Sequence, residues 1–211
     1  MHTQGKFTKK EKESRKLDTQ EKSTKKEKES KAVDTQKKST KKENHVVRQH
    51  VCHTFEPVWD TNSRVLILGT FPSVKSRENH FYYGHPQNRF WKMIAQITKS
   101  KLPETIEEKK KLLLTNHIAI WDVIASCDII GSSDSSITDV VPNDIAGLLA
   151  DTNIQTMLAN GKKAAELYNR YIYPQTKLPI VTMPSTSPAN AAWSLERLCA
   201  EYRKYTFTTF P

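Results

Sequence analysis

Glycine is scarce in this chain. Only 6 of the 211 residues are glycine, and no Gly-rich phosphate loop of either standard pattern follows an apolar run. This absence counts against an enzyme with a nucleotide cofactor. The pattern G-x-S-x-G is also missing, and no Ser-His-Asp order can be argued, so an α/β hydrolase of small molecules is a weak alternative.

Cysteine is scarce too. Cys52, Cys127 and Cys199 lie far apart and form no C-x-x-C pair, which argues against a disulfide framework, a zinc ribbon and an iron–sulfur cluster. His45, His50 and His53 lie near Cys52, but their spacing matches no structural zinc pattern, so no metal site is expected. Free cysteines are typical of a reducing compartment. We therefore expect an intracellular protein of the cytoplasm or nucleoid, or of the nucleus in a eukaryote.

Long apolar runs are missing. No stretch approaches the ~18 apolar residues that a transmembrane helix needs. The N-terminal segment MHTQGKFTKK lacks the apolar core of a secretory signal. We expect neither a membrane span nor a secretory signal.

Positive charge is abundant, but it is concentrated near the N-terminus. Residues 1–50 hold 16 Lys+Arg and 8 Asp+Glu, a net of +8 out of +10 for the chain. Residues 9–24 and 25–40 repeat one Lys-rich sequence with almost no apolar side chains. We predict a disordered basic tail over 1–44 and one domain over 45–211. Such a tail could attract DNA phosphates or direct nuclear import, or it could be a solvated extension without a partner. We favour the solvated extension because acidic residues interrupt the lysines.

Apolar runs and helical patterns alternate over the rest of the chain. Strands are predicted at 64–68, 154–158 and 178–183, and helices at 89–97, 105–116, 144–149, 162–172 and 191–205. Segment 117–124 fits either a strand or a buried turn, and 126–139, rich in Ser, Asp and Gly, is predicted to be a loop. The alternation predicts a three-layer α/β/α sandwich with a mainly parallel four-stranded sheet.

Small residues with hydroxyl or amide groups follow three of the predicted strands, at 69–73, 160–161 and 184–190. Because the carboxyl ends of parallel strands meet at one edge of a sheet, these segments are expected to line one pocket. The aromatic triplet 81–83 and the amides that follow it add aromatic and polar side chains to this expected pocket.

Two segments carry a family resemblance. The first motif is ILGTFPSVKSRENHFYYGHPQNRFWKMIA, residues 67–95, and the second motif is MPSTSPANAAWSLERLCAEY, residues 183–202. Together they resemble the uracil-DNA glycosylase superfamily, and within it the hypoxanthine-DNA (deoxyinosine) glycosylase branch. The resemblance spans about 60–205 and leaves out the tail.

The resemblance implies an enzyme that flips a deaminated base out of double-stranded DNA and hydrolyses its N-glycosidic bond, leaving an abasic site. Hypoxanthine is the expected base, with uracil or xanthine as a variant. It implies stacking of the base on Tyr83 or Phe71, and base contacts from Thr70 and Asn160. No lysine is placed to form a Schiff base, so a monofunctional glycosylase is expected. It is also expected to act as a monomer without a metal or cofactor.

One departure from the family pattern concerns the attacking water. Most branches carry an Asp or Asn directly before the proline of the first motif, where this chain has Phe71. The resemblance to the hypoxanthine branch implies an asparagine from the following loop in this role, and Asn88 matches it. An amide can orient a water, and His85 could protonate a leaving purine. From the residues alone, helix capping is the favoured role for Asn88, and a structural turn is the favoured role for His85.

The second motif implies contacts to DNA. Its loop residues Ser185, Thr186, Ser187 and Asn190, with Ser73 of the first motif, carry hydroxyls and amides suited to phosphates. Capping of the final helix is the simpler reading of the same residues. Lys75, Arg77 and Arg89 are further candidates for phosphate contact. The alternative function is a DNA-binding or damage-sensing module that has lost catalysis, which the substitution at Phe71 keeps open.

Overall fold

The computed structural model describes residues 47–206, so the predicted tail over 1–44 and the last residues of the chain lie outside the described part. Within that part, four parallel strands form the main sheet: β2 (Val65–Gly69), β3 (Ile118–Asp122), β6 (Thr156–Asn160) and β7 (Val181–Met183), in the order β3-β2-β6-β7. The predicted parallel four-stranded sheet is confirmed. Segment 117–124, left open between strand and turn, contains β3.

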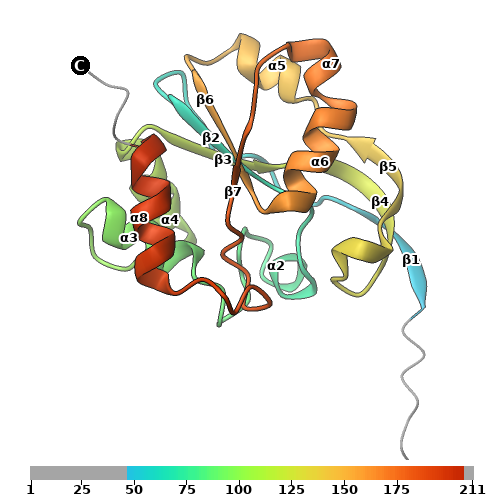
Figure 1. The fold of residues 1–211 in the computed structure, drawn as a ribbon, viewed down its shortest axis with the longest axis horizontal. Coiled ribbons are helices and arrows are strands. Elements are labelled where there is room, and N and C mark those ends of the chain that lie inside the picture. The colour runs from blue at the N-terminus through green and yellow to red at the C-terminus, as the bar shows by residue number, and fades with distance from the viewer. Residues whose placement is uncertain (1–46, 207–211) are drawn as a thin grey trace, which may run out of the picture. The chain divides into compact units, whose positions relative to one another are not determined.

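Helices cover both faces of this sheet, which confirms the three-layer sandwich (Figure 1). One layer holds α3 (Phe90–Ile97), α4 (Ile106–Thr115) and α8 (Leu195–Thr206), and the other holds α5 (Ile145–Ala150), α6 (Lys162–Tyr171) and α7 (Tyr173–Thr176). Strand β2 is buried throughout, because Val65 and Ile67 pack into the first core and Leu66 and Leu68 into the second. This two-sided burial explains why its sequence shows no alternation of polar and apolar residues.

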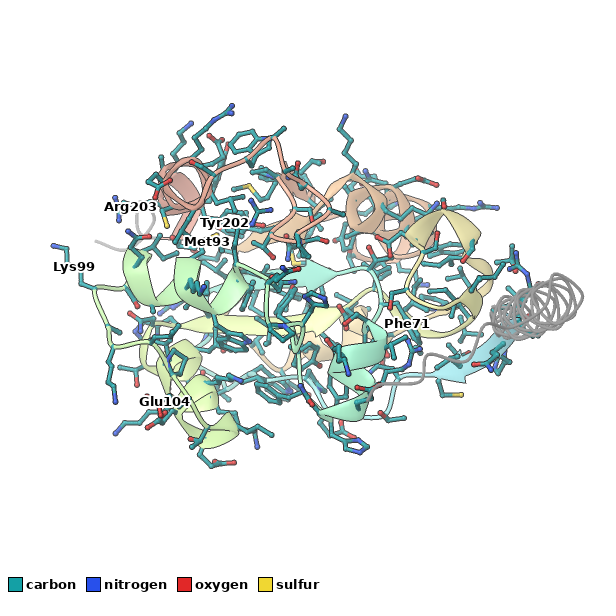
Figure 2. All side chains as sticks on the ribbon, turned by 90° about the horizontal axis from the view of Figure 1, so that it is seen from below. Phe71, Met93, Lys99, Glu104, Tyr202 and Arg203 are labelled. Carbon is teal, nitrogen blue, oxygen red and sulfur yellow. The ribbon has the colours of Figure 1, made fainter. Side chains whose placement is uncertain are left out.

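Helices α3 and α8 bring the two motifs together. Figure 2 shows Met93 of α3 near Tyr202 of α8, and both side chains are fully buried in the same core. The two helices begin close to the carboxyl edge of the sheet, so their packing fixes the loops that precede them.

The predicted loop over 126–139 is wrong. Strands β1 (Arg48–Cys52), β4 (Ile124–Ile130) and β5 (Thr138–Pro142) form a second, antiparallel sheet in the order β1-β4-β5. In β4, Cys127 and Ile129 are buried, while the polar residues Ser126 and Asp128 alternate with them and are only partly buried. The turn between β4 and β5, residues 131–137 and here called the β4–β5 turn, contains a short 3₁₀ helix, η1 (Asp134–Ser136).

Other boundaries differ by a few residues. The last helix begins at Leu195 rather than at 191, and the short helix α2 (Val74–Glu78) was not predicted. Asp144 caps α5, and Thr105 caps α4 with a complete capping box. None of the helices in the described range is long and apolar enough to span a bilayer.

Candidate active site

A pocket of about 550 Å³ opens at the carboxyl edge of the main sheet. This volume lies within the range of small-molecule sites. The pocket brings together nine of the predicted site residues: Thr70, Phe71, Ser73, Tyr83, His85, Asn88, Asn160, Ser185 and Ser187. It does not include Thr186 and Asn190, which are also predicted site residues.

The wall of the pocket at the ends of β2 and β3 carries a buried carboxylate. Asp122 ends β3, lies 4% exposed and accepts a hydrogen bond at Oδ2 from His53 Nε2 over 3.0 Å. A Cβ atom on Gly69, which ends β2, would lie 2.1 Å from Asp122 Oδ1. Only glycine therefore allows this approach. Phe71 lines the same wall and contacts the His53 ring edge-on.

An aromatic stack supports Tyr83. Its ring lies 3.8 Å from that of Phe90 at 18°, and its φ of +54° is a strained value for a residue with a bulky side chain. The Tyr83 hydroxyl is buried and makes no hydrogen bond of normal geometry with any residue in the described range. Burial raises the pKa of Tyr83, and the negative charge of Asp122 raises it further, while the nearby Asn160 amide opposes the shift. The hydroxyl is therefore a neutral donor at the pocket.

The residues before α3 form a tight turn. The Asn88 N–H donates to the His85 carbonyl oxygen over 2.8 Å, and the Gln87 N–H donates to His85 Nδ1 over 3.2 Å. Because Nδ1 accepts, the neutral His85 ring carries its proton on Nε2. Arg89 takes the backbone position of the helix cap, one residue after the predicted cap, while Asn88 Oδ1 accepts from the Phe90 N–H over 3.0 Å.

Asn160 joins β6 to the second motif. Its Oδ1 accepts from the Thr186 N–H over 2.9 Å and from the Tyr202 hydroxyl over 3.0 Å, and its Nδ2 donates to Thr186 Oγ1 over 3.0 Å. The amide oxygen is thus fully used inside the protein, and one N–H of Nδ2 is left for a ligand. Thr186 is completely buried, so its side chain holds the loop and does not face DNA.

The loop of the second motif is fastened by Arg89. The guanidinium donates to four backbone carbonyl oxygens of one short segment, those of Thr186, Ser187, Asn190 and Trp193. Asn190 adds a bond from its Nδ2 to the Ser185 carbonyl oxygen over 2.9 Å. Arg89 is therefore a structural clamp, and its guanidinium is not available to bind phosphate as the sequence suggested.

The opposite wall comes from the β4–β5 turn. Residues 132–135 of this turn line the pocket beside Thr70 and Ser73. Arg77, a second predicted phosphate ligand, instead donates to the carbonyl oxygens of Pro72 and Gly131 and so ties the first motif to this turn. Lys75 pairs at the surface with Glu78 over 2.6 Å.

Sequence reasoning missed three charged or titratable residues of this site: His53, Asp122 and Asp134. Asp122 directly follows an apolar run, as Asn160 does, so the rule that points to polar residues at strand ends could have found it. No comparable signal marks His53 or Asp134. Among residues 47–206, no group of three or more His, Cys, Asp or Glu side chains is placed to hold a metal ion.

The site can therefore hold a flat polar ring. It offers an aromatic platform, amide and hydroxyl donors, and carboxylate acceptors, which is the set of groups that reads the edge of a nucleobase.

Comparisons with known proteins identify the family of this chain. The family model of the uracil DNA glycosylase superfamily matches residues 56–206. A hypoxanthine DNA glycosylase of Methanosarcina acetivorans is 37% identical over 147 residues, which cover 68% of this chain and 90% of that protein. One of Methanosarcina barkeri is 36% identical over 115 residues, which cover 53% of this chain and 72% of that protein.

A solved structure shares the fold. The NMR solution structure of a candidate uracil DNA glycosylase from Methanosarcina acetivorans superposes with a TM-score of 0.61 at 33% identity, and covers 71% of this chain and 95% of that one. The matched family model spans both motifs and every element around the pocket from β2 to α8. The chain belongs to the uracil DNA glycosylase superfamily.

Proposed function

We propose that this protein is a monofunctional DNA glycosylase that removes hypoxanthine from deoxyinosine in double-stranded DNA. The observation that carries the proposal is the pocket itself, in which Tyr83, Asn160 and Asp122 meet at the edge of the sheet. The two relatives named hypoxanthine DNA glycosylase support this choice of base. Uracil and xanthine carry the same neighbouring C=O and N–H groups and are the next substrates to test.

The reaction begins with the flipping of the target nucleotide, which costs a few kcal/mol and least where pairing is already weak. We assign stacking of the base to Tyr83 and Phe71, and contacts to its edge to Asn160 and Thr70. Ser73, Ser185 and Ser187 lie at the pocket and are assigned to the DNA backbone, with Asn190 bracing their loop.

Asn88 is the proposed ligand of the attacking water. One lone pair of its Oδ1 accepts from the Phe90 N–H, and the second can accept from a water that points at C1′ of the sugar. Capping and catalysis are compatible because the cap holds the amide still. An amide is no proton acceptor of any strength, so its contribution is orientation.

His85 is the proposed donor to the leaving purine. Its Nδ1 is occupied by the Gln87 N–H, so the ring presents Nε2–H as its free donor. A purine leaves more easily once a ring nitrogen is protonated or hydrogen-bonded. Lys75 lines the pocket but its ammonium pairs with Glu78 at the surface, which supports a glycosylase without lyase activity.

A second candidate function is a DNA-binding or damage-sensing module of the same fold that no longer catalyses. Phe71, at the position where most branches carry an Asp or Asn, favours it. The two candidates differ in one observable, the formation of abasic sites.

Labelled duplexes that carry deoxyinosine, deoxyuridine or deoxyxanthosine opposite each normal base separate these functions. After incubation with excess protein, hot alkali cuts every abasic site. We expect cleavage with deoxyinosine and, at most, slower cleavage with the other two. Binding without cleavage of any duplex would favour the damage-sensing module.

A further inference from the structure

The β4–β5 turn is fixed to the first motif at three points. The Val74 N–H donates to Ser132 Oγ over 2.9 Å, Arg77 Nη2 donates to the Gly131 carbonyl oxygen over 3.4 Å, and Thr70 Oγ1 donates to Asp134 Oδ2 over 3.2 Å. A surface turn with this many cross-connections is held in one position against the pocket. It therefore places its side chains at the site rather than in free solvent.

Asp134 is the charged residue that this turn brings to the pocket. The residue as a whole is exposed, but its carboxylate lies against Thr70, where neighbouring groups displace water. This loss of water raises the pKa of Asp134, the hydrogen bond from Thr70 lowers it, the charge of Asp122 raises it, and Lys163 lowers it. The carboxylate is thus a better proton acceptor than an ordinary surface aspartate.

The hydrolysis needs a group of this kind. Positive charge builds up on the sugar as the glycosidic bond breaks, and the attacking water must lose a proton. Neither Phe71 nor the Asn88 amide can stabilise this positive charge or accept the proton of the water. Asp122 sits deep in the pocket with one oxygen bound to His53, and its 4% exposure suits a contact to the base. Asp134 lies on the exposed turn that lines the pocket. Because a flipped base enters the pocket from its open side, we expect the sugar to stay at this exposed rim.

We propose that Asp134 is a catalytic carboxylate that the β4–β5 turn supplies in place of the carboxylate or amide missing at Phe71. The water oxygen bonds to C1′ while the C1′–N9 bond breaks and leaves its electron pair on the purine. The purine takes up a proton from His85 or solvent. The water gives one proton to the Asp134 carboxylate, which then releases it to solvent, and the sum is addition of water across the bond.

This inference rests on the proposed function, and the activity of the wild-type protein shows which of the two fails. An inactive wild type on every duplex contradicts the glycosylase activity itself. If the wild type is active, Asp134→Asn tests the inference alone, since the Asn oxygen still accepts from Thr70 and the turn stays in place. The matched control is Asp139→Asn, which removes the same charge from exposed β5 of the same hairpin, outside the pocket.

Single-turnover excision of hypoxanthine should be at least ~10²-fold slower in Asp134→Asn and within about threefold of wild type in Asp139→Asn, because general base catalysis contributes ~10²–10⁴-fold. The affinity of Asp134→Asn for a duplex with an uncleavable 2′-fluoro analogue of deoxyinosine should stay within about threefold of the wild-type affinity. Thermal midpoints of the three proteins check that the fold is intact. An Asp134→Asn rate within about threefold of wild type would overturn the proposal, as would an equal loss in the control.

A pH profile provides the second readout. Three titratable groups of the surrounding elements interact electrostatically with Asp134: Asp122 of β3, Lys163 of α6 and Cys127 of β4. Arg77 of α2 binds the same turn at Gly131, and His85 lines the same pocket. The carboxylate acts when ionised, so the wild-type rate should rise with pH through its raised pKa and then level off. Asp134→Asn should lose this rising limb while Asp139→Asn keeps it. If the rate of Asp134→Asn still rises with pH as that of the wild type does, the ionisation belongs to another group and the proposal is overturned.

Discussion

Replacement of Arg89 by methionine tests whether the loop of the second motif is held by one side chain. The guanidinium donates to four carbonyl oxygens between Thr186 and Trp193, including bonds of 3.2 Å and 3.0 Å to Thr186 and Asn190. Methionine preserves the apolar stem and removes every donor. The bond from the Arg89 backbone N–H to Thr186 remains in the variant.

The size of the effect follows from these bonds. A hydrogen bond to a charged group contributes ~1.5–3 kcal/mol, and several bonds from one group are not additive. Since the loop is partly exposed, water replaces some of the lost donors. We expect the free energy of unfolding to fall by about 2–4 kcal/mol, which in a domain of this size lowers the thermal midpoint by roughly 4–16 °C. Arg89→Lys keeps the positive charge but lacks the planar guanidinium with its several donors, so its free energy of unfolding should fall by about half as much.

Chemical and thermal denaturation measure this loss directly. The matched control is Arg197→Ala, which removes an exposed guanidinium that donates to Ala192 and stacks over Trp193 at 4.5 Å. That control should cost at most about 1 kcal/mol, because exposed contacts contribute little. If Arg89→Met unfolds within about 1 kcal/mol of wild type, or no more easily than the control, the clamp does not hold the loop and the guanidinium is free to bind phosphate.

Three further predictions follow from single features. Tyr83→Phe removes a buried hydroxyl without a normal hydrogen bond, so the free energy of unfolding should stay unchanged or rise by up to about 1 kcal/mol, and a loss above 1 kcal/mol in urea titration would reveal a bonded hydroxyl. Gly161→Ala places a Cβ at φ +114° and 3.2 Å from the Ser185 Cβ, so it should destabilise by about 1–3 kcal/mol in the same titration, and a neutral result would contradict the strain. Deletion of residues 1–44 should flatten the salt dependence of DNA affinity if the lysines bind phosphates, whereas an unchanged slope in anisotropy titrations indicates a solvated extension.

The main sheet could be predicted from sequence because its strands are buried on both faces. Segments such as 65–68 are continuous apolar runs, and helical patterns separate them. The pocket residues at 69–73, 160, 185 and 187 follow from the rule that parallel strands end at one edge. These predictions depend on local pattern and on one topological rule, so they need no knowledge of distant contacts.

The second sheet could not be predicted in the same way. β4 is only partly buried, and it is a strand because Arg48–Cys52, about eighty residues earlier, pairs with it. Such a pairing leaves no mark in the local sequence. Asp134 was missed for the same reason, since its place at the pocket depends on how that hairpin folds back onto Thr70.

The roles of the basic residues also depended on distant contacts. The positive charges of Arg77 and Arg89 suggested contacts to phosphate. In the structure, both guanidiniums donate hydrogen bonds to backbone carbonyl oxygens of neighbouring loops. A sequence shows the charge of a residue and not its partner. Thr186 illustrates the same limit, because its burial against Asn160 is a property of the packed loop.

The most direct test of the proposed chemistry is the rate at which free hypoxanthine is released from a deoxyinosine duplex, measured by mass spectrometry under single-turnover conditions with the wild type and Asn88→Ala. The wild type should release one hypoxanthine per duplex, and Asn88→Ala should be at least ~10²-fold slower because the water is no longer oriented. An Asn88→Ala rate close to that of the wild type would contradict the assigned role of Asn88. A wild type that binds the duplex and releases no base would contradict the glycosylase itself.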